Sequence, residues 1–483
     1  MRVLLLLLVL RALVVPITAV AQCPDGSPAP CARPTAAARY SVAVLPFENR
    51  ARDTSLTLLA EGLADQITTD LGTVQRLDIK PPASVRFVLS RTPREPARLA
   101  RTLGSRWLVD GQLLSSGTSV HVNVQLIDAA NDRVRWTGTF QRPGDDPFAV
   151  ISTVADSVAT AIIGALAPED RARFTRRPTT DNSALAAYTR GMGALHHFDE
   201  ADLRYAVAQF ERAATADTTF AEAWAGLAEA LIWMDVYTAP SEVYPRARDA
   251  AQRALALDST SSPALGVLAS IAVGYDWDPI RGEALARRAL QRDSGYGRAW
   301  VYLADALVSQ GRRAAAADAY ARAVAADTLD EEVATEATFG LQVARQTDAA
   351  LALVRRWRQL QPDDMAWDRI EASILVSAKR CATSPPRTPR SAIALACAGR
   401  VAAARAATDT LVAQFESGRH VPAIYLAVTF VSLGDKEAAL RWFTRAVDER
   451  AYSMVDAREN PIWDSLRDDP RFAAQLERIQ PAR

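Results

Sequence analysis

The sequence lacks a net charge: Lys plus Arg and Asp plus Glu number 56 each among 483 residues. A balanced chain creates no long-range field that would attract nucleic acid or an anionic membrane surface, so we expect neither as a partner. Lysine is scarce, and none of Lys80, Lys379 and Lys436 follows the glycine-rich turn of a phosphate-binding loop. The HExxH, GxSxG and protein-kinase motifs do not occur either. We therefore expect no catalytic site and no cofactor.

Histidine is scarce as well, with four residues in the chain. His196 and His197 form the one histidine cluster of the sequence. Adjacent side chains on a helix point about 100° apart, which makes them poor co-ligands for a metal ion. We expect a solvated or partly packed pair there, and no metal site.

The four cysteines form two local pairs that lie far apart in the sequence. Cys23 and Cys31 bracket a Pro- and Gly-rich segment, and Cys381 and Cys397 bracket a Pro-rich insertion. This spacing does not match that of zinc ligands. In an oxidising compartment each pair would close a short disulfide loop, which is the interpretation that we favour, and free thiols are the alternative.

Residues 1–21 have the pattern of a signal peptide, with a basic start, an apolar stretch and a small-x-small cleavage signal. We expect cleavage before Gln22 and export to the periplasm, with a Pro-rich linker over 22–39. An uncleaved membrane anchor is an alternative, although Arg11 would then lie near the middle of the span, where a charge is costly. A lipid anchor on Cys23 is a third possibility, although Gln22 stands where such sites favour a small residue.

Residues 40–168 are predicted to form an α+β domain, because the period of the apolar residues switches repeatedly between two and 3.6. The predicted order of elements is β-α-β-α-β-β-β-α. The last three strands are expected to form an antiparallel meander with one apolar face, to which Val134, Trp136 and Phe140 contribute. Glu48 to Asp53 is expected to be a capped connecting loop; a small-ligand site is the alternative, because α/β folds sometimes hold ligands between a first strand and the helix that follows.

The runs SVAVLPFEN, LAEGLADQITTDL, WLVDGQL and VNVQLIDA of this domain resemble the TolB amino-terminal-like domain. That domain is related to flagellar and curli outer-membrane assembly domains. Bacteria often join it to tetratricopeptide repeats (TPRs), sometimes in chains that also hold an adenylate cyclase, a Ser/Thr kinase or a winged-helix regulator. The resemblance implies a non-catalytic module, and the sequence shows none of those enzyme or DNA-binding motifs.

From residue 185 onward every strong apolar pattern has helical spacing, and similar segments recur near the ~34 residues of a TPR unit. The second helix of each unit carries small, larger and small residues at i, i+4 and i+7. Six segments match this template: Ala206, Phe210, Ala213; Ala247, Ala251, Ala254; Gly282, Ala286, Ala289; Ala316, Tyr320, Ala323; Ala350, Val354, Trp357; and Ala439, Phe443, Ala446. We predict an all-α TPR solenoid over 185–450, and a mainly α chain overall.

Two stretches depart from the simple repeat. Residues 366–419 fit the template poorly, so the superhelix is expected to be irregular or broken there. The final run ENPIWDSLRDDPRFAAQLERI resembles the tail that often closes TPR arrays. We expect capping helices over 451–483, which would cover the last exposed apolar face.

First-helix residues line the concave surface in the TPR family. The template places a mixed and partly aromatic set there: Glu222, Glu229, Trp233, Arg298, Tyr302, Asp305, Phe339 and Gln342. Units that clamp a terminal carboxylate carry Lys, Arg and Asn on this surface, whereas Glu229 and Asp305 are acidic. We therefore expect no carboxylate clamp. A solvated face that binds nothing is the alternative interpretation of these residues.

Two functional hypotheses follow. The first is a non-enzymatic exported scaffold that binds a protein or peptide partner through the concave surface, in an envelope or signalling assembly. The alternative is a sensory module in which the N-terminal domain binds a small ligand and the TPR array relays the change. Neither requires a membrane span after cleavage of the signal peptide, and the oligomeric state is left open.

Overall fold

The structure is a computed structural model that describes residues 40–51, 56–74, 76–116, 119–143, 147–175, 177–195, 199–362, 364–383, 386 and 389–479. The predicted signal peptide, the linker with Cys23 and Cys31, and the His196–His197 pair lie outside these ranges. Among the helices that the structure describes, none is long and apolar enough to cross a bilayer.

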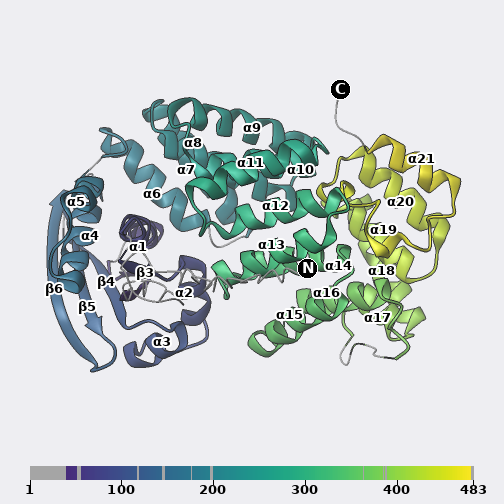
Figure 1. Cartoon of the computed structure of the whole chain (residues 1–483), viewed down its shortest axis with the longest axis horizontal. Helices are drawn as coiled ribbons and strands as arrows, with labels where there is room; N and C mark the ends of the chain where they lie inside the picture. Colours follow the sequence, from purple (N-terminus) through teal and green to yellow (C-terminus); the bar gives the residue numbers. More distant parts are fainter. Residues whose placement is uncertain are drawn as a thin grey trace, which may run out of the picture.

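The N-terminal domain is a mixed sheet with helices on both faces (Figure 1). Its strands are β1 (Tyr40–Val44), β2 (Glu48–Asn49), β3 (Leu77–Ile79), β4 (Trp107–Ser116), β5 (Ser119–Asp128) and β6 (Arg133–Pro143). Its helices are α1 (Thr57–Gly72), α2 (Pro82–Leu89), α3 (Pro96–Leu103), α4 (Pro147–Ile163) and α5 (Pro168–Thr175). The strand order is β3-β1-β4-β5-β6, with β1 parallel to β3 and β4, and β4, β5 and β6 antiparallel.

The two faces of this sheet bury separate apolar clusters. On one face Val42, Val109 and Val124 pack with residues of α1 and α4. On the other face Ala43 and Leu108 pack with residues of α2 and α3. Alternate residues of β1 and β4 therefore enter different cores, which explains why 42–44 and 107–109 are continuous apolar runs.

Three details of this domain differ from the prediction. The two-residue strand β2 extends the sheet beside β4, in what was expected to be a plain loop. Helix α2 was not predicted; it begins at Pro82, and proline is tolerated in the first turn of a helix. Val134 is 53% exposed, so its assignment to the apolar face was wrong. A bulge opposite Leu126 and Ile127 turns the side chains at the start of β6 to the opposite face of the sheet from the one that simple alternation predicts.

The rest of the chain is built from antiparallel helix pairs. The pairs are α6 (Asn182–Leu195) with α7 (Glu200–Ala216), α8 (Ala221–Trp233) with α9 (Pro240–Leu257), α10 (Ser262–Gly274) with α11 (Pro279–Arg292), α12 (Gly297–Ser309) with α13 (Arg313–Ala326), α14 (Glu331–Val343) with α15 (Thr347–Leu360), α17 (Ala392–Cys397) with α18 (Val401–Glu416), and α19 (Ala423–Ser432) with α20 (Lys436–Asp448). A 3₁₀ turn, η2 (Met234–Val236), follows α8. The predicted fold class, an α+β domain followed by an all-α solenoid, is confirmed.

Aspartates end four of the second helices. Asp217, Asp258, Asp293 and Asp327 are the C-terminal caps of α7, α9, α11 and α13. Each accepts a hydrogen bond from the backbone N–H two residues later. This side-chain turn closes the connection to the next pair, so no proline is needed there.

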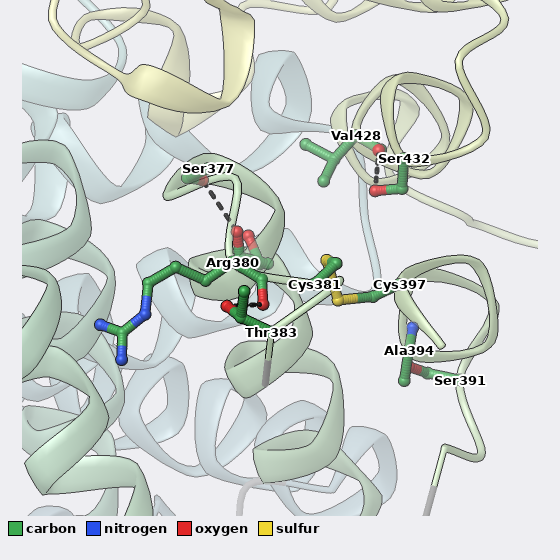
Figure 2. Close-up of a disulfide and its surroundings, with 10 residues drawn as sticks. Ser377, Arg380, Cys381, Thr383, Ser391, Ala394, Cys397, Val428 and Ser432 are labelled. Atoms are coloured by element: carbon green, nitrogen blue, oxygen red, sulfur yellow. Dashed lines mark hydrogen bonds between the residues drawn. A yellow bond between two sulfur atoms is a disulfide. The ribbon is translucent and has the colours of Figure 1, made fainter. Parts of the chain in front are cut away.

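Helix α16 (Met365–Ser377) interrupts the regular alternation, because no second helix follows it directly. The Pro-rich segment 378–391 stands in that place, and proline disfavours a helix interior. Cys381 in this segment forms a disulfide with Cys397 at the end of the six-residue helix α17 (Figure 2). The irregularity lies within the stretch 366–419 that fits the repeat template poorly.

The sheet domain contacts the solenoid at two separate places. Helix α1 lies along α6, so closely that a Cβ atom on Gly62 would stand 1.8 Å from the carbonyl oxygen of Thr189. At the second place the Phe87 ring of α2 meets the Trp357 ring edge-on at 5.1 Å. These contacts join the beginning of the array to its middle.

The C-terminal residues contact the solenoid from the opposite side. They form the 3₁₀ turns η3 (Tyr452–Met454) and η4 (Pro461–Trp463) and the helix α21 (Pro470–Arg478). Phe472 of α21 and Trp463 pack on Phe443 of α20, which covers the last pair. The segment also reaches back to α10, where a Cβ atom on Gly274 would stand 2.0 Å from the Tyr452 ring. We call residues 451–466 the return segment.

Candidate functional site

A hollow lies on the inner side of the solenoid, between the first helices and the return segment. Its volume is about 570 Å³, which is in the range of ligand-binding pockets. The first helices α8, α12 and α14 line one side of it, and Tyr452, Asp456 and Trp463 line another. We call this space the inner cavity. The return segment thus turns an open concave surface into an enclosed site.

Most of the residues predicted for the concave surface meet at this cavity. Six of them line it: Trp233, Arg298, Tyr302, Asp305, Phe339 and Gln342. Glu229 lies behind that wall, where its carboxylate pairs with Arg298. Glu222 is exposed and does not line the cavity.

Arg298 is the buried cation of the wall, and it is already engaged. Its Nη1 lies 2.6 Å from Oε1 of Glu229, and its guanidinium lies over the Trp233 ring, 4.4 Å from the centroid. The nearby acids raise its pKa above the ordinary value of an arginine despite its burial. Arg298 therefore belongs to a neutralised pair within the wall and is not a free clamp for a carboxylate.

Asp305 holds the return segment in place. Its Oδ1 accepts a hydrogen bond of 2.5 Å from the Tyr320 hydroxyl, and its Oδ2 accepts one of 2.9 Å from the Tyr452 hydroxyl. Burial raises the pKa of Asp305 to about 6, although the hydrogen bonds from both tyrosines oppose this shift. A residue that the repeat template assigned to partner binding is thus used for a contact within the chain.

Gln342 is also used internally. Its Nε2 donates hydrogen bonds to the Ser373 and Ser377 hydroxyls of α16, at 3.2 and 2.7 Å. These bonds tie α14 to the irregular helix. Phe339 remains half-buried and faces the cavity as part of its apolar wall.

Sequence reasoning missed five acidic residues of the cavity: Glu449, which pairs with Arg445, and the four carboxyls of Asp235, Glu332, Glu336 and Asp456. Burial raises the pKa of each of these four carboxyls, to about 6, 7, 8 and 8 in that order. The like charge of Asp305 adds to the shifts of Glu336 and Asp456, whereas Arg298 opposes the shift of Glu336. Glu332 and Glu336 lie one turn apart on a first helix, and that spacing could have assigned them to the concave surface.

The carboxylates differ in how they are satisfied. Asp235 accepts a hydrogen bond of 2.7 Å from the Tyr244 hydroxyl. No hydrogen bond or ion pair of the Glu332 or Glu336 side chain occurs among the residues that the structure describes. Asp456 Oδ1 is fully buried without a hydrogen-bond partner in the same part of the chain. The cavity therefore contains acidic oxygens that the protein itself leaves unbonded.

These acids do not form a metal centre in the described ranges, where no group of three or more His, Cys, Asp or Glu side chains could hold a metal ion. The disulfide Cys381–Cys397 lies at α16 and α17 (Figure 2), and neither cysteine lines the cavity.

Comparison with known proteins matches parts of the chain. Residues 38–158 match the family model of the second domain of HilA/YgeH-like transcriptional regulators. A putative adenylate cyclase 3 of Rhizobium meliloti is 27% identical over 194 residues, which are 40% of this chain and 33% of the relative. The chain thus spans about a third of that relative's length.

Solved structures of low identity match each part of the molecule. A thermophilic TPR protein from Thermus thermophilus is 16% identical, with 40% of this chain and 99% of that chain covered and a TM-score of 0.34. TolB from Acinetobacter baumannii is 19% identical, with 27% and 29% covered and a TM-score of 0.21. TM-scores this low support no conclusion about function. The structural class of the chain therefore follows from its own helix pairs.

The described residues form seven antiparallel pairs, and the small-large-small template lies on the second helix of six of them. The chain is a TPR-like helical repeat protein. In this TPR-like protein the alanines of the template, such as Ala206, Ala286 and Ala316, have no exposed surface. The small alanine side chains let the two helices of a pair approach closely. The first helices of the pairs line the cavity.

Proposed function

We propose that this chain is an exported, non-enzymatic scaffold that binds a segment of a protein or peptide partner at the inner cavity. The observation that supports the proposal is the enclosed cavity of about 570 Å³ on the concave side, where aromatic walls stand beside unbonded carboxylates. Pockets of this size and mixed lining suit a short segment or side chain better than a flat surface does. The cavity lies in the solenoid, so the proposal places binding there and not in the sheet domain.

The sheet domain has a supporting role in this proposal. We infer that it is a TolB-like non-catalytic module, as its sequence pattern suggests, and that its two contacts hold the array in one curvature. The contacts are apolar and tight at Gly62 and Phe87, so the cavity behind them would stay preformed. A preformed site loses less conformational entropy when it binds.

Photo-cross-linking in the native host tests the binding site. A photoreactive phenylalanine analogue replaces Phe339, which lines the cavity, and in a matched control it replaces Ile280, which is 66% exposed on α11. We expect a discrete cross-linked product from position 339 and none from position 280. Equal products from both positions, or none from position 339, would contradict binding at the cavity.

Export is tested separately by the mass of the protein recovered from the host. Cleavage before Gln22 predicts a chain that starts at that residue and is found in the periplasmic fraction. A chain that keeps residues 1–21, or that is recovered with the cytoplasm, would contradict the export part of the proposal and leave the binding part standing.

A further inference from the structure

The inner cavity has a pronounced excess of acidic over basic groups. Asp235, Asp305, Glu332, Glu336 and Asp456 all line it. Its two arginines face aromatic rings: Arg298 lies over Trp233, and Arg369 lies 5.1 Å from the centroid of Tyr425. Arg298 is also paired with Glu229, and its charge opposes the rise in the pKa of Glu332 and Glu336.

The remaining walls are aromatic and aliphatic. Tyr237, Tyr302 and Tyr425 present ring surfaces, and Val301 and Val333 present aliphatic ones. Ring faces attract organic cations, most strongly where water is excluded. Aliphatic walls suit the methylene stem that carries such a cation in a lysine or arginine side chain.

Three acidic side chains of the cavity have oxygens without a hydrogen-bond partner among the described residues, and these oxygens could accept hydrogen bonds from a positively charged ligand. Glu332 and Glu336 make no hydrogen bond or ion pair within the described residues, and Asp456 Oδ1 is buried without a partner there. Asp456 Oδ1 is fully buried, and a buried acceptor without a donor destabilises the folded state. A ligand that donates hydrogen bonds and carries positive charge would remove that destabilisation, whereas an anion or an apolar ligand would not.

We propose that the inner cavity recognises an organic cation, an ammonium or guanidinium group on an aliphatic stem, held by Glu332, Glu336 and Asp456. The inference rests on the proposed function, because it names the chemistry of the group that the concave side binds. A basic peptide side chain and a free polyamine share this chemistry. The cavity admits either source, and binding measurements separate them.

The first measurement compares probes that differ only in charge, by calorimetry on the purified protein at about pH 9, which is above the pKa of about 8 of Glu336 and Asp456. The pairs are N-acetyl-lysine amide with N-acetyl-norleucine amide, and the peptide Ac-Ala-Ala-Lys-Ala-Ala-amide with its norleucine analogue; spermidine is the free polyamine. We expect each lysine probe to bind at least about tenfold more tightly than its norleucine partner. Equal affinities within each pair, or no binding of any cationic probe, would overturn the inference.

The relative affinities then identify the source. A peptide that binds at least about tenfold more tightly than spermidine identifies a basic peptide as the ligand. Spermidine that binds as tightly as the peptide identifies a small amine. Both results support recognition of a cation, and both leave the cavity as the site.

The second measurement removes the acidic groups. The double variant Glu332→Gln with Glu336→Gln is expected to lose at least about tenfold in affinity for the cationic probes and none for the norleucine probes. Glu222→Gln, on an exposed first-helix position outside the cavity, is the matched control and should bind like the parent. The double variant should unfold at the same temperature as the parent or a higher one, so a loss of binding would not reflect a loss of fold.

The two proposals fail in different ways. If the cross-link from position 339 persists at full yield in the Glu332→Gln, Glu336→Gln variant, the scaffold proposal stands and cation recognition is wrong. If the cationic probes bind but position 339 gives no cross-linked partner in the host, the cavity is a cation site and the scaffold proposal fails.

Discussion

The two ends of the chain both fold back onto the solenoid, but they use different chemistry to do so. The sheet domain docks through close apolar contacts, with Gly62 against the backbone of α6 and Phe87 against Trp357. The return segment combines one aromatic anchor at Trp463 with hydroxyl and ion-pair contacts, including Tyr452 with Asp305. The first contact is mainly apolar, with one buried hydrogen bond from Ser84 to Asp327, whereas the second has several polar contacts.

The difference between the two contacts corresponds to a difference in role: the sheet domain supports the solenoid, whereas the return segment forms part of the cavity. An apolar interface fitted to backbone atoms has one arrangement, because interiors are close-packed and do not deform freely. A polar interface around a cavity can exchange its partners, because a net hydrogen bond contributes only about 1 kcal/mol. We therefore expect substitutions at the sheet-domain contact to act mainly on stability, and substitutions at the return segment to change both stability and the groups that line the cavity.

The largest expected effect tests whether the return segment depends on its aromatic anchor. Trp463 is 1% exposed and packs on Phe443 and Phe472. Trp463→Ala should lower the free energy of unfolding by about 3–5 kcal/mol, as large-to-small core substitutions do. Urea denaturation measures it, and Val401→Ala, at a position 51% exposed, is the control with an effect below about 0.5 kcal/mol. A loss near that of the control would show that polar contacts alone hold the segment.

The next effect tests the fit of the sheet domain. Gly62→Ala places a methyl group where Thr189 O stands at 1.8 Å, so the backbones must separate, at a cost of about 1–3 kcal/mol. Gly72→Ala lies in the same helix with no atom near its Cβ position, and should be neutral or stabilising by up to about 1 kcal/mol. Thermal unfolding compares the two variants. Equal behaviour would mean that α1 and α6 are not in close contact.

The third effect is the pH dependence that the cavity imposes. The folded pKa of Glu336, about 8, lies above its ordinary value, so the folded state binds more protons between about pH 5 and 8. Stability should be fully present below that window and fall as pH rises through it, by about 1.4 kcal/mol per pH unit while one carboxyl titrates. Asp235, Asp305, Glu332 and Arg298 are the charged groups whose fields reach Glu336.

Glu336→Gln should flatten that pH dependence, and chemical denaturation at a series of pH values measures it. Glu222→Gln, outside the cavity, should leave the curve unchanged. A stability of the parent protein that rises between pH 6 and 8 would contradict the burial of these carboxyls.

The smallest effect concerns a single hydroxyl. Tyr452→Phe removes the hydrogen bond to Asp305 and should cost about 1 kcal/mol, with a further rise in the pKa of Asp305. Tyr425 lines the same cavity, and no hydrogen bond of its hydroxyl occurs in the described part of the chain. Tyr425→Phe should therefore have almost no effect on the urea midpoint, and a larger loss there than at Tyr452 would reverse the assignment.

The repeat template could be read from the sequence because each unit repeats the same local packing requirement. Alanines at helical spacing predicted the second helices, and the concave positions of Trp233, Tyr302 and Phe339 followed from the same register. The alternation of apolar and polar residues along the sheet strands could be predicted equally well from the sequence, except where the bulge beside Val134 reverses it.

The contacts between distant segments could not be read in this way. Asp305 and Tyr452 are 147 residues apart, and no periodic pattern connects them. The template treated residues 451–483 as a terminal cap and had no means to place part of them inside the array. The sequence therefore contained no pattern that would assign Asp456 to the cavity. Glu332 and Glu336, in contrast, lie on a helix whose concave face was already predicted.

The return segment has one more consequence, which concerns how such an array can grow. An open solenoid gains or loses units by duplication, since each unit touches only its neighbours. Here Tyr452 must meet Asp305 at the cavity, and Arg345 must meet Asp464 at the surface. An extra pair inserted between α12 and the end of the array would carry these partners out of register. The cavity can therefore form only with the present number of repeats between α12 and the end of the array.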